Sequence, residues 1–140
     1  MMDSLARMGS EEDIVFAERM FTINSHKALL LAEAARERNP DRFEELNERL
    51  FRACFSEVKN LGDEQVLRRI ASDAGIPGDT VDRALSDPVY EEKLETQQRM
   101  ASAIGVTGIP TFVVGGKFVL EGAVPLELLI HAANEALAVP

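Results

Sequence analysis

One stretch near the C-terminus constrains the fold more than any other: residues 105–123, which read GVTGIPTFVVGGKFVLEGA. Two short runs in it, Thr111–Val114 and Lys117–Leu120, are rich in the β-branched and aromatic residues that favour strands. The glycine pair at 115–116 predicts a two-residue hairpin turn, because both central positions of such a turn need a positive φ. Pro110 precedes the first run, where its missing N–H removes no ladder hydrogen bond. The stretch therefore predicts a β-hairpin entered through a proline loop.

The residue pattern around Pro110 does not determine whether the Ile109–Pro110 peptide bond is cis or trans. Glycines at 105 and 108 free the backbone just before it, and cis prolines occur typically in tight turns. Trans bonds nevertheless outnumber cis bonds by roughly twenty to one among X–Pro bonds. From the residues alone, both isomers stay open.

The N-terminal part of the chain reads as helices. Residues 1–10 predict a loose arm, and the acids at 11–13 predict a brief helix that runs to about Arg19. Asn24 or Ser25 is predicted to cap the next helix, which should run to about Asn39, where Pro40 stops it. Its first half is apolar nearly all round, which places such a helix in the middle of a bundle.

The remaining helices are separated by prolines, glycines and caps. A helix opened by Pro40 runs towards Asn60, and one apolar stripe of it is expected to face inward: Phe43, Leu46, Leu50, Phe51, Cys54, Phe55 and Val58. Further helices are predicted from Asp63, from Pro77, from Asp87-Pro88 to Gly105, and from Pro125 to about Leu137. The long one from Asp87 should bury Tyr90, Leu94, Gln97, Ala101 and Ile104, and the last one Leu128, Leu129 and Ala132. The predicted organisation is an arm (1–10), a helical domain (11–104) and a hairpin-plus-helix region (105–140).

Charge and cysteine content narrow the function classes. The formal net charge of −9 predicts neither a nucleic acid nor an anionic membrane as partner, since both attract basic surfaces. A single cysteine excludes an internal disulfide. No signal-peptide pattern and no apolar run of about 20 residues is present, so a cytoplasmic protein is expected.

The candidate catalytic groups are few, and none is assigned. Cys54 lies on an apolar stripe, where a buried structural thiol is favoured over a reactive one. His26 starts a helix, so it reads as an ordinary polar residue there or as part of a pocket, and His131 reads as a surface residue. Neither histidine has ligands at metal-site spacing. We expect no cofactor, no metal and no catalytic residue among these side chains.

Several motifs resemble a known family. Gly108-Ile-Pro-Thr111, the strand, glycine turn and strand, Gly122-Ala123 and the helix at 125–129 resemble the closing half of a thioredoxin fold. Residues 21–104 resemble the helical insertion of the DsbA-like branch, which includes the 2-hydroxychromene-2-carboxylate isomerase type. The segments Asn24-Ser25-His26 and Leu50-Phe51-Arg52-Ala53 are similar to patterns of that branch. The resemblance implies an α+β fold, mostly α, in which a helical insertion precedes the hairpin and final helix of an incomplete thioredoxin fold, with Pro110 in a cis bond.

The same resemblance implies a DsbA-family thiol–disulfide oxidoreductase. These families carry Cys-X-X-Cys at the start of their first helix, after an initial strand. This chain has one cysteine and nothing that reads as that first strand. The expectation is therefore a fragment without the redox pair, with the missing thioredoxin half as its partner. The alternatives are a non-catalytic peptide- or protein-binding module and, more weakly, a relative of the glutathione-dependent isomerases.

The resemblance also implies a site and a partner surface. Thr107 and Gly108 would form the approach, Ile109 would offer its backbone to an extended peptide, and Pro110 would form the wall. This is recognition by strand addition, in which main-chain hydrogen bonds supply the affinity. Because the strand that the family pairs with Thr111–Val114 is not in this sequence, we expect a homodimer that pairs this edge.

Overall fold

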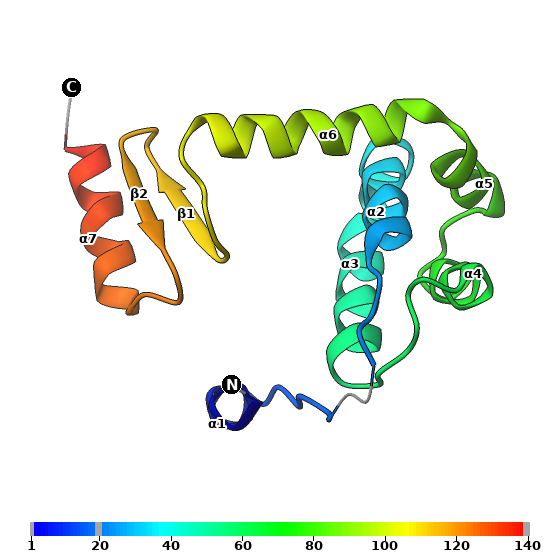
Figure 1. Ribbon diagram of the computed structural model, residues 1–140, viewed down its shortest axis with the longest axis horizontal. Coiled ribbons are helices and arrows are strands. Elements are labelled where there is room, and N and C mark those ends of the chain that lie inside the picture. The colour runs from blue at the N-terminus through cyan, green and yellow to red at the C-terminus, as the bar shows by residue number, and fades with distance from the viewer. Residues whose placement is uncertain (1, 19–20, 139–140) are drawn as a thin grey trace. The chain divides into compact units, whose positions relative to one another are not determined.

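The computed structural model describes residues 2–18 and 21–138. Within them the elements are α1 (Met2–Glu11), α2 (His26–Arg38), α3 (Pro40–Phe55), α4 (Glu64–Asp73), α5 (Gly78–Ser86), α6 (Pro88–Ala103), β1 (Thr111–Val114), β2 (Phe118–Glu121) and α7 (Leu126–Leu137), as Figure 1 shows. This is the mostly helical α+β class that the sequence predicts. The chain divides into two compact units, one up to Leu94 and one from Glu95 onward. None of the described helices has the length and apolar character needed to cross a membrane.

Helices α2 to α5 build the core of the first unit. α2 packs against both α3 and α5, and its Leu31, Ala34 and Ala35 are fully buried. A helix that is apolar nearly all round is stable in such a place because several of its sides meet other helices. This confirms the central position predicted for this helix. Leu29 is an exception, since its side chain is 50% exposed.

The helix starts follow the predicted capping residues. Asp63 Oδ1 accepts a hydrogen bond from the Gln65 N–H at 2.8 Å at the start of α4. Pro40 is the first residue of α3, and Pro88 is the first residue of α6. An aspartate cap satisfies an amide of the first turn, and a proline at the first position has no amide to satisfy. The local signals therefore position these helices correctly.

The apolar stripe of α3 is confirmed in part. Leu46 and Leu50 are buried, and Phe43 and Cys54 are half-buried against the core. Phe51, however, is 57% exposed, so its predicted inward position is wrong. α3 also ends at Phe55, earlier than the break predicted near Asn60, and Val58 beyond it has a φ of 53°, which does not continue a right-handed helix.

The N-terminal region differs most from the prediction. α1 occupies residues where the sequence predicted a loose arm, and residues 14–18 are not helical where a brief helix was predicted. Asp13 has a φ of 56°, a left-handed conformation that interrupts a right-handed helix. The predicted end of that helix, Arg19, lies outside the described residues.

Long-range contacts explain why residues 14–18 are not helical. Ser56 Oγ donates a hydrogen bond to the Val15 carbonyl at 2.6 Å, and the Ala17 N–H donates to the Phe55 carbonyl at 2.9 Å. The ring of Phe16 also meets the ring of Phe55 edge-on, with centroids 5.9 Å apart. These hydrogen bonds use backbone groups that would pair with each other in a local helix. The end of α3 therefore determines the conformation of residues 14–18.

In the second unit, β1 and β2 form an antiparallel hairpin. Both turn glycines have the predicted positive φ, 59° and 67°, and the Lys117 N–H donates to the Val114 carbonyl at 3.2 Å. Val114 pairs with Phe118, however, so three residues rather than two separate the paired positions. The predicted glycine conformations are confirmed. The second strand begins one residue later than predicted because Lys117 belongs to the connection.

α7 lies beside this hairpin (Figure 1), and few described residues of this unit are buried. Ala132 is the one buried hydrophobic residue in the described part of the second unit, and Leu129 is half-buried. Leu128 is 49% exposed, so the prediction that it is buried is wrong. The turn lies close to α7 at Gly115, where an added Cβ would stand 2.5 Å from the Cβ of Ala136.

Helix α6 contributes to both units. Tyr90 is buried and Leu94 half-buried, whereas Gln97 and Ile104 are exposed. The inward face predicted for this helix thus holds for its first two turns. The two compact units divide after Leu94, inside this helix. A sequence shows where a helix ends, but not where its packing changes.

Candidate functional site

The four residues of the predicted binding loop, Thr107, Gly108, Ile109 and Pro110, lie between α6 and β1 in the second unit. The Ile109–Pro110 peptide bond is cis. The Ile109 side chain is 93% exposed, and none of the hydrogen bonds among the described residues engages its backbone. The loop therefore presents an apolar side chain and an unpaired peptide group at the same residue.

One side of this loop is tied to the end of β2. Thr107 Oγ1 donates to Glu121 Oε1 at 3.0 Å, and the Thr107 N–H points to the same oxygen at 3.4 Å. Sequence reasoning missed Glu121. The hairpin register offers a signal for it, because Glu121 pairs with Thr111 and so stands close to the residues that precede β1.

Replacing Glu121 by alanine is expected to loosen the loop, because it removes the acceptor of both Thr107 contacts. Hydrogen bonds to a charged group contribute about 1.5 to 3 kcal/mol when buried, and this exposed one should contribute about 1 kcal/mol or less. We expect the Thr107 amide to exchange with solvent several times faster in Glu121→Ala, measured by NMR. Glu127→Ala is the control, since Glu127 lies on α7; equal acceleration by both variants would contradict the role given to Glu121.

The other side of the loop continues the hairpin ladder. The Gly122 N–H donates to the Pro110 carbonyl at 2.7 Å, and Thr111 Oγ1 donates to the Gly108 carbonyl at 2.7 Å. Hydrogen-bonded pairs alternate along an antiparallel ladder. Because Pro110 bonds towards Gly122, the backbones of Phe112 and Val114 point towards β2. The groups of Thr111 and Val113 point to the outer edge of β1.

The other candidate residues do not join this loop. Cys54 is half-buried against the core of the first unit, which agrees with a packed thiol more than with an exposed nucleophile. His26 is exposed, and its Nε2 lies 2.9 Å from Glu91 Oε2 at the start of α6. His131 is exposed on α7. No group of three or more potential metal ligands is assembled in the described part of the chain.

Two cations of the first unit have pKa values that depart from the ordinary range. Hydrogen bonds to Asp82 and then to Glu64 raise the pKa of Arg68. A hydrogen bond to Glu37 raises the pKa of Lys93. Both groups therefore stay charged. A lysine that acts as a base or nucleophile needs a lowered pKa, so Lys93 is suited to an ion pair rather than to catalysis.

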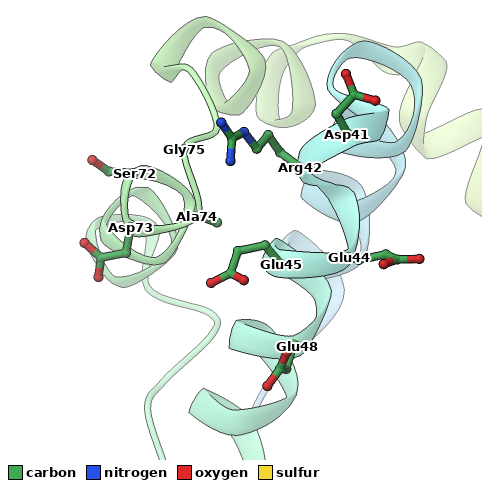
Figure 2. A pocket seen from close by; sticks show the side chains of 9 residues that line it. All are labelled: Asp41, Arg42, Glu44, Glu45, Glu48, Ser72, Asp73, Ala74 and Gly75. Carbon is green, nitrogen blue, oxygen red and sulfur yellow. The ribbon is translucent and has the colours of Figure 1, made fainter.

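A pocket of about 650 Å³ opens in the first unit between α3 and the end of α4 (Figure 2). Acidic side chains dominate its lining, which comprises Asp41, Arg42, Glu44, Glu45, Glu48, Ser72, Asp73, Ala74 and Gly75. In Figure 2 the Glu44 side chain points away from α4, and that of Glu45 points towards it. This excess of negative charge disfavours an anionic ligand. None of the predicted binding-loop residues lines the pocket.

Comparison with known proteins places these features in a family context. A family model described as a DSBA-like thioredoxin domain matches residues 1–133. The protein YwbO of Bacillus subtilis, described as uncharacterized, is 30% identical over 92 residues, which are 65% of this chain and 46% of YwbO.

Two solved structures are similar in fold. A probable DsbA oxidoreductase from Streptomyces coelicolor superposes with a TM-score of 0.87 at 26% identity, covering 99% of this chain and 59% of that protein. A putative protein disulfide isomerase from Nitrosomonas europaea gives a TM-score of 0.75 at 15% identity, covering 97% and 71%. The chain thus spans about half the length of YwbO and about three fifths of the Streptomyces protein.

Proposed function

The chain belongs to the DSBA-like thioredoxin domain family, and from this premise we propose that it provides the substrate-recognition part of a thiol–disulfide oxidoreductase. The proposal assigns the binding of an extended polypeptide to Thr107, Gly108, Ile109 and Pro110. The main observation in support of the proposal is the exposure of Ile109. Its side chain is 93% exposed, and its peptide groups have no hydrogen-bond partner among the described residues.

The loop has the properties that strand-addition recognition requires. Affinity in this mode comes from main-chain hydrogen bonds, and nearby side chains supply selectivity. Thr107 and Pro110 are held to the second strand and its end through Glu121 and Gly122. Binding therefore orders little additional backbone, which lowers the entropy cost of association. The ligand expected beside Ile109 is an extended polypeptide segment with apolar side chains.

The redox step is assigned to a thiol pair outside these 140 residues. Thiol–disulfide exchange proceeds by thiolate attack on a disulfide through a mixed disulfide, and a second thiol then resolves that intermediate. The chain has one cysteine, and Cys54 is half-buried in the first unit. We therefore propose that a Cys-X-X-Cys segment, joined to this chain or supplied by another, attacks the polypeptide that the loop holds.

Peptide titration tests the recognition step. The probe is the insulin B chain with both thiols alkylated, so that it binds as an extended polypeptide without redox chemistry. We expect shifts of the amide signals of residues 107–111 in NMR spectra. Ile109→Asp should weaken binding at least tenfold, because it places a charge where an apolar side chain meets the peptide.

Leu137→Asp is the matched control, since Leu137 is 84% exposed in the same unit and lies far along the sequence from the loop. It should leave the affinity unchanged. If the alkylated chain perturbs no signal at residues 107–111, or if both variants weaken binding equally, the assignment of the loop is wrong.

A second candidate is a non-catalytic binding module that uses the same loop, and the half-buried single cysteine favours it. The two candidates agree that the pure chain does not accelerate insulin reduction by dithiothreitol. They differ when a Cys-X-X-Cys-bearing polypeptide of the family is added. If the chain is part of an oxidoreductase, the mixture reduces insulin faster than the added polypeptide does alone. If the chain is a binding module, the rate of insulin reduction is the same with and without the chain.

A further inference from the structure

We propose that the binding loop selects extended polypeptides in which a lysine or arginine flanks the apolar segment, and that Glu121 sets this preference. The specificity rests on the proposed function, because it names the class of polypeptide that the loop recognises. Glu121 then has two roles. Its carboxylate holds Thr107 through a hydrogen bond, and it presents a negative charge to the bound polypeptide.

The carboxylate of Glu121 has one oxygen in use and one available. Oε1 accepts a hydrogen bond from Thr107 Oγ1 at 3.0 Å, and the Thr107 N–H points to the same oxygen at 3.4 Å. Among the described residues, no hydrogen bond or ion pair engages Oε2, and the residue is exposed. An ionised carboxylate accepts about four hydrogen bonds. Glu121 can therefore hold Thr107 and accept from a cationic ligand at the same time.

Neither lysine nor arginine of the second unit neutralises this charge. Arg99 and Lys117 are the only such residues from position 95 onward. Arg99 Nη1 lies 3.6 Å from Glu95 Oε2. Lys117 belongs to the connection between the strands, at the opposite end of the hairpin from the paired residues Thr111 and Glu121. The loop therefore lies beside a negative charge without a counter-ion in its own unit, which favours a cationic ligand.

This charge lies close to the backbone that receives the polypeptide. Thr107 is two residues before Ile109, so their Cα atoms lie at most about 7.6 Å apart. Successive residues of an extended peptide rise about 3.3 Å. A peptide that pairs with Ile109 and continues past Thr107 therefore brings a residue near Glu121 within one to three positions. The flexible four-carbon stem of a lysine lets its ammonium group reach the carboxylate from there.

The charge of the whole chain acts in the same direction. Its formal net charge is −9, which attracts basic polypeptides and repels acidic ones over a longer range. This general attraction does not depend on any single carboxylate. The contact with Glu121 does, so removing one charge at a time separates the two effects.

Three capped peptides test the preference. They share a valine-leucine-valine centre and differ only in the residue on both sides of it, which is lysine, glutamine or glutamate. At low salt the lysine peptide should bind about five- to tenfold more tightly than the glutamate peptide, because an exposed ion pair and an exposed like-charge pair each contribute modestly. The Kd is obtained from shifts of the amide signals of residues 107–111. About 0.5 M salt should remove most of the difference, since it screens exposed charges.

Glu121→Gln separates the charge from the support of the loop. Glutamine keeps an oxygen that can accept from Thr107, so the Thr107 amide should exchange with solvent as in the wild type. The ratio of the Kd values of the glutamate and lysine peptides should fall to about two or less. Glu127→Gln is the matched control, because it removes the same charge from the same unit, on α7. It should leave the ratio as in the wild type.

Equal Kd values of the three peptides for the wild-type chain would overturn the preference, while the Ile109→Asp titration tests the role of the loop separately. A ratio that falls equally in Glu121→Gln and Glu127→Gln would also overturn it, since net charge alone would then explain the difference. So would a ratio that disappears when a Cys-X-X-Cys-bearing family polypeptide is added, because groups of that polypeptide would then occupy Glu121. If none of the peptides shifts residues 107–111, recognition by the loop fails, and the specificity fails with it.

Discussion

Replacing Leu31 by alanine is expected to lower the free energy of unfolding of the helical unit by about 2 to 5 kcal/mol, because the change removes a fully buried side chain and leaves a cavity. Leu31 has no exposed surface, and it lies on α2, the helix that packs against both α3 and α5. The cost should be towards the upper end of the range, since neighbours held by two other helices can close the cavity only in part. Urea unfolding followed by helical circular dichroism measures it.

Leu29→Ala provides the comparison within the same helix. Leu29 is 50% exposed, and alanine has the higher helix propensity, so we expect a change below about 1 kcal/mol. A Leu31→Ala protein as stable as Leu29→Ala would mean that α2 does not occupy the centre of the bundle.

The sequence predicted those elements whose determinants are local. Asp63 caps α4 through a bond to the amide two residues on, and Pro40 and Pro88 stand at the first helical positions. The glycine pair adopts the positive φ that its place between two strand-forming runs demands. In each case the deciding interaction involves residues within a few positions along the chain, so a sequence can reveal it.

The sequence-based predictions failed where residues far along the chain determine the local conformation. Residues 14–18 are not helical, because Phe55 and Ser56 form hydrogen bonds with their backbone, and no local pattern signals those partners. Phe51 and Leu128 were also predicted to be buried but are exposed. A stripe of apolar residues predicts which face of a helix is apolar, but not which of its residues contact another element.

The binding role of the four loop residues stays a prediction, and the contacts that hold the loop could not be predicted from the motif. Thr107, Gly108, Ile109 and Pro110 were identified from a motif, and the structure places them in one loop. The exposure of Ile109 and the hydrogen bond from Thr107 to Glu121 are features of the folded structure that the motif does not reveal. The hairpin register links these two facts, because it brings the end of β2 beside the residues that precede β1.

Replacing Gly115 by alanine is expected to disrupt the hairpin and its contact with α7. Gly115 has a φ of 59°, which costs alanine about 1 to 2 kcal/mol. The new Cβ would also stand 2.5 Å from the Cβ of Ala136, and such overpacking costs typically about 1 to 3 kcal/mol. The sum, about 2 to 5 kcal/mol, is large for a unit with little buried apolar surface. The Lys117 amide, which donates to Val114, should lose its protection from hydrogen exchange by at least tenfold.

Gly116→Ala separates the two causes, because Gly116 also has a positive φ, 67°, but no atom lies within 4 Å of an added Cβ. It should show the conformational cost alone, about 1 to 2 kcal/mol. The hairpin holds Glu121 and Gly122 against the proline loop, so Gly115→Ala should also weaken binding of the alkylated insulin B chain more than Gly116→Ala does. If Gly116→Ala has the larger effect on both readouts, the contact between α7 and the turn does not support the loop, and the order of Thr107–Pro110 must come from residues before β1.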